Sequence, residues 1–404
     1  MLYNHLRKAV CVSLSLAMMC GVFTGFTAYE EEGTAIDDIT VVEETEESDG
    51  EVAIVPEEVV TDEVSIDPAL GTDDDEGDEL PIVPEGDTPI TLSAHTIATE
   101  GLIVLNFKLI LPDEFMADVA NGAKILINGV EQDIANAPHD GARLVFSYAV
   151  PAAEIFDTVA LETLRSNGEG YPMVDKNGVL IGSTFDYSVQ EYIDYARTVA
   201  SGNQKLMDLV NYLSEYGNYA VDAFHHETTG PVPAKDEDIA AEIDAITKNT
   251  PEIVDLAPVV SDDGSQPLAY DVSTLELQSG TNINHYFTIA SGADINNYKF
   301  VVDGKEVSYG SPNGNLSVIK DSKKANRYVL IISGIPAPEI GTRNSIKVVV
   351  KSTGTEFIDL SYCAGSYIYT TLNKYSEMPQ YDAVCKTVKA LYLYYVAADA
   401  YFNG

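Results

Sequence analysis

Few side chains of this sequence stand in the patterns that metal binding requires. Its six histidines form no His-x-x-x-His or His-Glu-x-x-His pattern, the spacing at which two imidazoles on one helix face hold zinc. The adjacent pair His225-His226 could ligate a metal, but two neighbouring histidines are an unspecific pattern. A solvated helix end explains the pair better, since positive charge suits the C-terminus of a helix. We therefore predict no metal and no cofactor.

Catalytic patterns are equally sparse. The sequence has no Gly-x-Ser-x-Gly elbow. Glycosidases use two carboxylates, and Glu154 and Glu339 follow similar Pro-containing turns. A lone glutamate beside a proline is better explained as a cap on a turn. We predict that the protein is not an enzyme and has no catalytic residue; an enzyme of a type that these patterns do not reveal is an alternative hypothesis.

Two cysteines lie outside the N-terminal leader. Cys363 stands at a predicted helix start, where the helix dipole could lower the thiol pKa, and Cys385 lies in the next predicted helix. In an antiparallel helical hairpin, position 363 lies beside the far end of the second helix and not beside 385. We therefore expect two buried thiols that pack as small hydrophobic groups, with a disulfide as the alternative in an oxidising compartment.

Tyrosines are the remaining candidates for a functional surface. The chain has 24 tyrosines and no tryptophan, and several tyrosines cluster on two predicted helices. The candidate binding surface comprises Tyr212, Tyr216, Tyr219, Tyr392, Tyr394 and Tyr395. Exposed tyrosine contributes a large contact area at a small entropic cost. The alternative, which we favour, is that these rings fill the contact between the helices and a β-sandwich.

Charge and leader indicate the compartment. The chain has 64 acidic and 23 basic residues, which argues against nucleic acid and anionic membranes as partners. Arg7 and Lys8 precede an uncharged run at 9–28 that ends in small residues, the pattern of a secretory signal peptide. An uncleaved membrane anchor is the alternative. We expect a protein that is secreted or held at the extracellular surface.

The segment 29–92 is predicted to be a disordered acidic spacer. It contains 24 acidic residues and no lysine or arginine. Self-repulsion and low apolar content keep such a segment extended. The folded part then begins at 93.

Two kinds of hydrophobic pattern follow each other after the spacer. Short strands with turn signals, among them Asn128-Gly129, predict an antiparallel β-sandwich over 93–185. Ser188 and Glu191 then form a capping box, which predicts the start of a two-helix hairpin. One apolar seam marks its second helix and comprises Leu206, Val210, Leu213, Gly217, Ala220 and Phe224.

The same order of patterns occurs a second time. Shifting the seam by 178 positions gives Val384, Val388, Leu391, Tyr395, Ala398 and Phe402. Asn128-Gly129 matches Asp303-Gly304, and the run 151–155 matches the run 336–340. Matches in one order indicate an internal repeat. We predict an α+β fold of two modules, 93–228 and 270–404, each an antiparallel β-sandwich followed by an antiparallel two-helix hairpin. The linker 229–269 between them carries one short helix over 236–248, bracketed by Pro233 and Pro251.

The Pro-x-x-Glu-Ile turn and the Tyr/Ala-rich hairpin that ends in Ala-x-x-x-Phe resemble modules of secreted and surface proteins of anaerobic Gram-positive gut bacteria. The resemblance covers roughly 89–224 and 270–402. It implies an extracellular repeat and no particular chemistry.

Three functions are consistent with these patterns. The first is a non-catalytic extracellular interaction protein that binds a glycan or another protein. The second is a structural spacer or assembly unit of the cell envelope, and the third is the unrecognised enzyme above. Export, duplication and the missing catalytic patterns favour the first.

Overall fold

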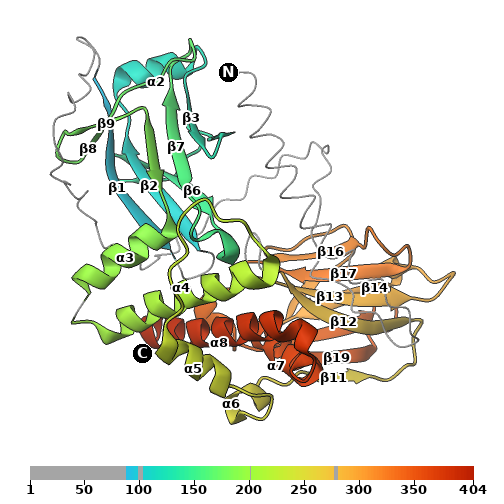
Figure 1. Ribbon diagram of the computed structural model, residues 1–404. Coiled ribbons are helices and arrows are strands. Elements are labelled where there is room, and N and C mark those ends of the chain that lie inside the picture. The colour runs from blue at the N-terminus through green and yellow to red at the C-terminus, as the bar shows by residue number, and fades with distance from the viewer. Residues whose placement is uncertain (1–87, 99–102, 201, 277–280) are drawn as a thin grey trace.

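The computed structural model describes residues 88–98, 103–200, 202–276 and 281–404. The predicted signal peptide and the spacer up to residue 87 lie outside the described residues. The described chain is a mixed α+β fold with several antiparallel sheets, as predicted from the sequence (Figure 1). Within these ranges, every helix is too short or too polar to be a candidate membrane span.

Two sheets make up the first half, residues 88–228. The first has the strand order β5 (His139–Asp140), β6 (Arg143–Ala149), β2 (Val104–Ile110), β1 (Ile90–Ala98), β8 (Met173–Asp175), β9 (Leu180–Gly182). The second has the order β10 (Thr184–Tyr187), β7 (Val159–Leu164), β3 (Lys124–Ile127), β4 (Val130–Glu131). The sheets face each other, since the ring centroids of Phe107 on β2 and Phe185 on β10 are 6.4 Å apart. The sequence predicted antiparallel pairing throughout, but β1 and β8 pair in parallel.

Two further sheets make up the second half, residues 259–404. One has the order β11 (Val259–Asp262), β19 (Glu356–Tyr362), β18 (Asn344–Val350), β14 (Tyr298–Val302), β15 (Lys305–Val307). The other has the order β12 (Leu268–Glu276), β13 (Asn282–Ile289), β17 (Arg327–Ile332), β16 (Leu316–Lys320). These sheets also face each other, because the rings of Phe287 and Phe300 meet with centroids 5.0 Å apart.

Both halves begin before the predicted boundaries. β1 starts at Ile90, inside the segment predicted to be spacer, and β12 starts at Leu268, inside the predicted linker. β11 also lies in that linker and was not predicted. All four of its residues are exposed, so no alternation of buried and exposed side chains marks the strand in the sequence.

Equivalent tight turns join β3 to β4 and β14 to β15. Asn128 and Asp303 both adopt positive φ, at 50° and 48°, and each is followed by a glycine with φ near 80°. The Asn128 side chain accepts from the Ala160 amide at 2.9 Å, and Asp303 accepts from the Ser345 amide at 2.8 Å. The predicted Asn-Gly hairpin is confirmed.

Replacing Gly129 by alanine is expected to lower the free energy of unfolding by about 1–2 kcal/mol, since its φ of +80° is unfavourable for a side chain with Cβ. Gly129→Asn is the control, because asparagine tolerates this region and should cost clearly less. Urea denaturation measures both. Equal costs for alanine and asparagine would contradict this explanation.

A helical hairpin follows the strands in each half. The first contains α3 (Val189–Val199) and α4 (Gln204–Phe224), and the second contains α7 (Ala364–Tyr375) and α8 (Asp382–Phe402). The predicted capping box is confirmed: the Glu191 amide donates to Ser188 Oγ at 3.1 Å, and the Ser188 amide donates to the Glu191 carboxylate at 2.7 Å. At the start of α7, the Cys363 amide donates to Ser366 Oγ at 3.2 Å.

Shorter elements complete the described chain. The linker contains α5 (Glu237–Ala245), which confirms the predicted helix, and α6 (Pro251–Val254), which was not predicted. The remaining elements are α2 (Asp113–Val119), η2 (Ala152–Glu154), η3 (Ile295–Asn297), η4 (Ala337–Glu339) and η5 (Pro379–Tyr381).

The two halves share one hydrophobic core. Buried side chains of both belong to a single cluster, which includes Val210 of α4 and Leu391 of α8. These two helices lie side by side at the centre of the helical part (Figure 1). Two residues of the predicted seams pack on turns of their own half, since Gly217 lies against Ile155 and Tyr395 lies against Gly341.

Candidate interaction surface

Three of the six candidate tyrosines are buried between the halves. Tyr216, Tyr219 and Tyr394 are each no more than 6% exposed. The Tyr216 and Tyr394 rings are stacked, with centroids 6.0 Å apart and planes inclined by 12°. The Thr387 hydroxyl of α8 donates to the Tyr219 carbonyl of α4 at 2.8 Å. These tyrosines cannot serve as a binding surface, because they fill the contact between α4 and α8.

The linker covers a fourth candidate. The Tyr212 hydroxyl donates to the Glu242 carboxylate of α5 at 2.7 Å. Burial, aided by this carboxylate, raises the pKa of Tyr212 well above its usual range, so the hydroxyl remains a donor. The neighbouring Asp236 amide donates to Glu215 at 2.8 Å, and Lys235 lies 4.5 Å from the ring centroid of Tyr219. The segment that begins α5 is thus bound across α4.

The last two candidates, Tyr392 and Tyr395, are partly buried. Their rings meet edge to face with centroids 6.0 Å apart. A Cβ added at Gly341 would lie 2.2 Å from the Tyr395 hydroxyl, so that hydroxyl packs directly on the turn after η4. We conclude that the tyrosine cluster is mainly part of the interior. The favoured alternative placed these rings between the helices and a β-sandwich, but Tyr216 and Tyr394 meet between α4 and α8, and Tyr212 meets α5.

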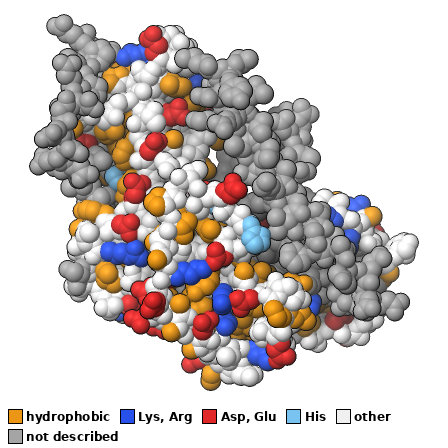
Figure 2. Space-filling model, viewed as in Figure 1, with side chains coloured by type: hydrophobic (Ala, Val, Ile, Leu, Met, Phe, Trp, Pro, Cys, Tyr) orange, Lys and Arg blue, Asp and Glu red, His pale blue; other side chains and the backbone are white. Residues whose placement is uncertain are grey.

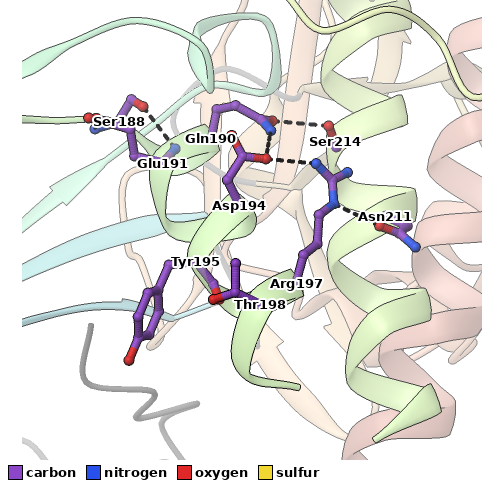
Figure 3. Close-up of polar contacts among 9 residues, drawn as sticks. All are labelled: Ser188, Gln190, Glu191, Asp194, Tyr195, Arg197, Thr198, Asn211 and Ser214. Carbon is purple, nitrogen blue, oxygen red and sulfur yellow. Dashed lines mark hydrogen bonds and ion pairs between the residues drawn. The ribbon is translucent and has the colours of Figure 1, made fainter. Parts of the chain in front are cut away.

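A polar network on the first hairpin is the best candidate for an interaction surface (Figure 3). The Gln190 amide group donates to Asp194 at 2.8 Å, and the buried Ser214 hydroxyl donates to Gln190 at 3.0 Å. Arg197 donates to Asp194 at 2.8 Å and to Asn211 at 2.9 Å. The five residues link α3 to α4 and fix the directions of their polar groups. We call this set the hairpin network.

The corresponding part of the second hairpin is covered. Gln190 and Gly365 occupy equivalent places, because their amides donate to the carbonyls of Ile155 and Ile340 after equivalent 3-10 turns, at 3.0 and 2.7 Å. A Cβ added at Gly365 would lie 3.0 Å from the side chain of Leu256, so the linker packs there. On the first hairpin, Asp194 is exposed and Arg197 partly exposed at the equivalent surface.

Charges of both signs lie beside hydrophobic side chains over the helical part of the visible face (Figure 2). Lys235 forms an ion pair with Asp222, and Lys248 lies 2.6 Å from Glu377. The hairpin network was not predicted from the sequence. Its signal was the spacing of Gln190, Asp194 and Arg197, which places three polar side chains on one face of a helix.

The second half contains a buried chain of polar groups. Ser273 Oγ lies 2.6 Å from His285 Nδ1 and 2.7 Å from the Tyr270 hydroxyl. Burial lowers the pKa of His285 to about 3, so the imidazole is neutral. A serine next to a histidine can act as a nucleophile, but His285 is fully buried and Ser273 is 6% exposed. Tyr270, Ser273 and His285 therefore form an internal hydrogen-bond network between β12 and β13.

The histidine pair His225-His226 ends α4, as predicted. His225 is the C-cap, with φ of 52°, and His226 Nε2 lies 2.7 Å from Asp157. Asp157 also accepts from the Thr229 amide at 2.7 Å. Across the part of the chain that the structure describes, no three His, Cys, Asp or Glu residues are grouped so that they could hold a metal ion.

The contact between His226 and Asp157 predicts a pH dependence of stability. The hydrogen bond to Asp157 raises the pKa of His226 above 6.5, against the opposing effect of burial. The stabilisation of the fold by protonated His226 is fully present below pH 6.5 and is lost as the pH rises through the folded-state pKa of His226. The stability difference between the natural protein and His226→Gln should therefore shrink between pH 6 and pH 9, measured by urea denaturation. A difference that grows with pH would contradict this sign.

The two described cysteines, Cys363 and Cys385, are free thiols, and both are buried. Burial raises the pKa of Cys385, so this thiol is a poor nucleophile. The sequence analysis expected two buried thiols, because position 363 of an antiparallel hairpin lies far from position 385, and the free thiols agree with that expectation.

In comparisons with known proteins, no protein-family model and no curated protein matches the chain.

Proposed function

We propose that this chain is a non-catalytic interaction protein that acts outside the cell, and that its two halves are copies of one β-sandwich and hairpin module. Equal strand orders support the duplication. The order β5-β6-β2-β1 matches β16-β17-β13-β12, and β10-β7-β3-β4 matches β19-β18-β14-β15. β1 and β12, which occupy matching places in these orders, also each carry a bulge, at Ser93 and at Asp271.

The stacking of Tyr216 on Tyr394 is the single observation that most strongly supports the proposed duplication. These tyrosines are 178 positions apart, the shift that aligns the two helical seams. In an interface with two-fold symmetry, a residue near the axis contacts its own equivalent. The halves therefore resemble the subunits of a symmetric dimer joined in one chain.

This arrangement holds two equivalent modules in a fixed relation. The α4–α8 contact buries aromatic rings, and α5 binds across it through Tyr212. A protein that presents two rigid modules can engage two sites on a glycan or protein surface at once, which raises the overall affinity without new contacts. We propose that the hairpin network provides one contact, since its polar groups are held by each other on rigid helices.

The test is binding by the exported chain. A glycan array and a pull-down from secreted proteins should each be run with the natural protein and with Asp194→Ala/Arg197→Ala. We expect a ligand that binds the natural protein and binds the variant at least about tenfold more weakly, as two charged hydrogen-bonding groups are removed. Lys124→Ala/Glu131→Ala, which removes an exposed ion pair at 3.6 Å on another sheet, is the matched control. Blank results on both platforms would remove support for the proposal.

A structural role in the cell envelope is the second candidate, favoured by the rigid α4–α8 contact. A spacer or assembly unit has to keep a constant shape under load, and burial of Tyr216 and Tyr394 resists separation of the halves. Light scattering over a wide concentration range separates the candidates. Self-association at micromolar concentration supports the structural role, whereas a strictly monomeric protein contradicts it.

Location outside the cell requires its own test. We expect the exported protein to lack residues 1–28, because this segment has the order of a secretory signal peptide. Mass spectrometry of protein recovered from the culture medium measures the N-terminus. Recovery of the full leader in the membrane fraction would identify the segment as an anchor instead.

A further inference from the structure

His285 of β13 lies fully inside the second half, with 0% of the residue exposed. Its Nδ1 lies 2.6 Å from the Ser273 hydroxyl of β12, and that hydroxyl lies 2.7 Å from the hydroxyl of Tyr270. Its Nε2 has no hydrogen-bond partner among the described residues. A neutral imidazole can leave one nitrogen unpaired as an acceptor, whereas an imidazolium needs an acceptor for each of its two N–H groups. The surroundings of His285 therefore fit the neutral ring only.

The imidazole packs at the point where the second β-sandwich continues into its helical hairpin. The rings of His285 and Tyr362 meet edge to face, with centroids 5.1 Å apart. Tyr362 ends β19, and the next residue, Cys363, is the N-cap of α7. Tyr362 is 3% exposed and Cys363 is 0% exposed. A charge on His285 would therefore arise directly beside the start of α7.

The titratable groups that the described chain places around His285 supply no negative charge to balance a proton. Tyr270 on β12 and Tyr362 on β19 contribute phenols, and burial raises the pKa of both, so they stay neutral in acid. On β17, the Arg327 guanidinium lies 4.4 Å from the ring centroid of Tyr286. The side chain of Tyr286 points to the opposite face of the sheet from that of His285, because the two residues are neighbours on one strand.

We propose that His285 makes the second half sensitive to acid: a proton on this imidazole breaks its packing on Tyr362 and opens the start of the second hairpin. Burial lowers the pKa of His285 from 6.5 in the unfolded chain to about 3 in the fold. The stabilisation from burying the neutral ring is therefore complete above pH 6.5 and is lost as the pH falls from 6.5 towards the folded-state pKa. This sign is opposite to that of His226, and the inference holds whatever ligand the protein binds.

The first half shows that a phenylalanine fits at the matching place. A shift of 178 positions places Phe107 on His285, and it places His95 on Ser273. His95 lies opposite Phe107 in the pairing of β1 with β2, as Ser273 lies opposite His285 in the pairing of β12 with β13. Phe107 is 0% exposed. The substitution His285→Phe therefore removes the titrating group and keeps a ring that this place in the module accepts.

Thiol labelling of Cys363 in the full chain tests the proposal, because opening the start of α7 exposes this buried thiol. The natural protein and His285→Phe are treated with dithiodipyridine, which reacts with thiols in acid, and peptide mass spectrometry identifies the modified cysteine. The ratio of the two labelling rates at one pH cancels the intrinsic reactivity of the thiol. We expect the ratio of natural to variant rate to rise roughly 30- to 100-fold between about pH 6.5 and about pH 4.5, since each pH unit favours the open form by up to about tenfold.

Two further measurements make the test specific to His285. His139→Phe is the matched control, because β5, which contains His139, is exposed, and its labelling ratio to the natural protein should not change with pH. Nitrogen NMR shifts of the His285 ring in the natural protein should show a neutral imidazole at about pH 4.5. This measurement needs no variant and decides the question even where His285→Phe does not fold. A labelling ratio that is constant with pH, or an imidazolium in the folded protein at about pH 4.5, would overturn the proposal.

Discussion

Tyr216→Ala is expected to lower the free energy of unfolding by about 3–5 kcal/mol, the range for truncating a large buried aromatic side chain. Tyr216 is 4% exposed and stacks on Tyr394, which is also 4% exposed. Each alanine substitution opens a cavity in the contact between α4 and α8. Urea denaturation of the natural protein and of both single variants measures the loss.

Tyr216→Phe and the double variant sharpen this test. Tyr216→Phe retains the ring and should cost much less than alanine. Because the rings touch, the Tyr216→Ala/Tyr394→Ala variant should lose less than the sum of the single losses, by about 0.5–1.5 kcal/mol. Strict additivity would contradict direct stacking. Tyr309→Ala, at a ring that is 36% exposed, is the surface comparison and should cost far less.

Gly217→Val is expected to lower the free energy of unfolding by about 2–3 kcal/mol through overpacking. A Cβ at this position would lie 2.2 Å from Ile155 Cδ1 and 3.2 Å from the Ala152 carbonyl oxygen. α4 rests on η2 here, so an added side chain must push the helix away from the turn. Urea denaturation detects the loss, and near-ultraviolet circular dichroism reports any change in tyrosine packing.

A second substitution separates steric conflict from helix propensity. Gly217→Ala alone raises helix propensity by about 1 kcal/mol, yet we expect a net loss because of the contact with Ile155. Adding Ile155→Ala creates space, so the double variant should be more stable than the sum of single effects predicts. Gly202→Ala, at a glycine with open space around it, is the control and should be nearly neutral. A stabilising Gly217→Ala would refute the close approach.

Local chemistry made several elements predictable. Ser188 and Glu191 satisfy free amides at the start of α3, an interaction complete within four residues of sequence. Asn128-Gly129 likewise forms its turn from residues that tolerate positive φ. The apolar spacing in 206–224 predicted a buried face on α4, and Leu206, Leu213 and Ala220 are buried.

The tyrosines show where such reasoning stops. The spacing of Tyr212, Tyr216 and Tyr219 indicates a helix with several rings on its surface, but it does not say what lies against them. In the structure, α5 meets Tyr212 and α8 meets Tyr216. The hairpin network was overlooked for a related reason, because Asn211 and Ser214 reach α3 only after the helices have docked.

The sequence by itself determined the α+β class, the starts of α3 and α7, the tight turns and the linker helix α5, because each depends on neighbours along the chain. Only the tertiary structure decided that α4 packs on α8, that β11 joins β19, and that Tyr216 meets Tyr394. Tyr216 and Tyr394 are 178 positions apart in the sequence. An apolar or aromatic pattern determines that a face is buried, whereas its partner is chosen by the competition among all faces in the folded chain.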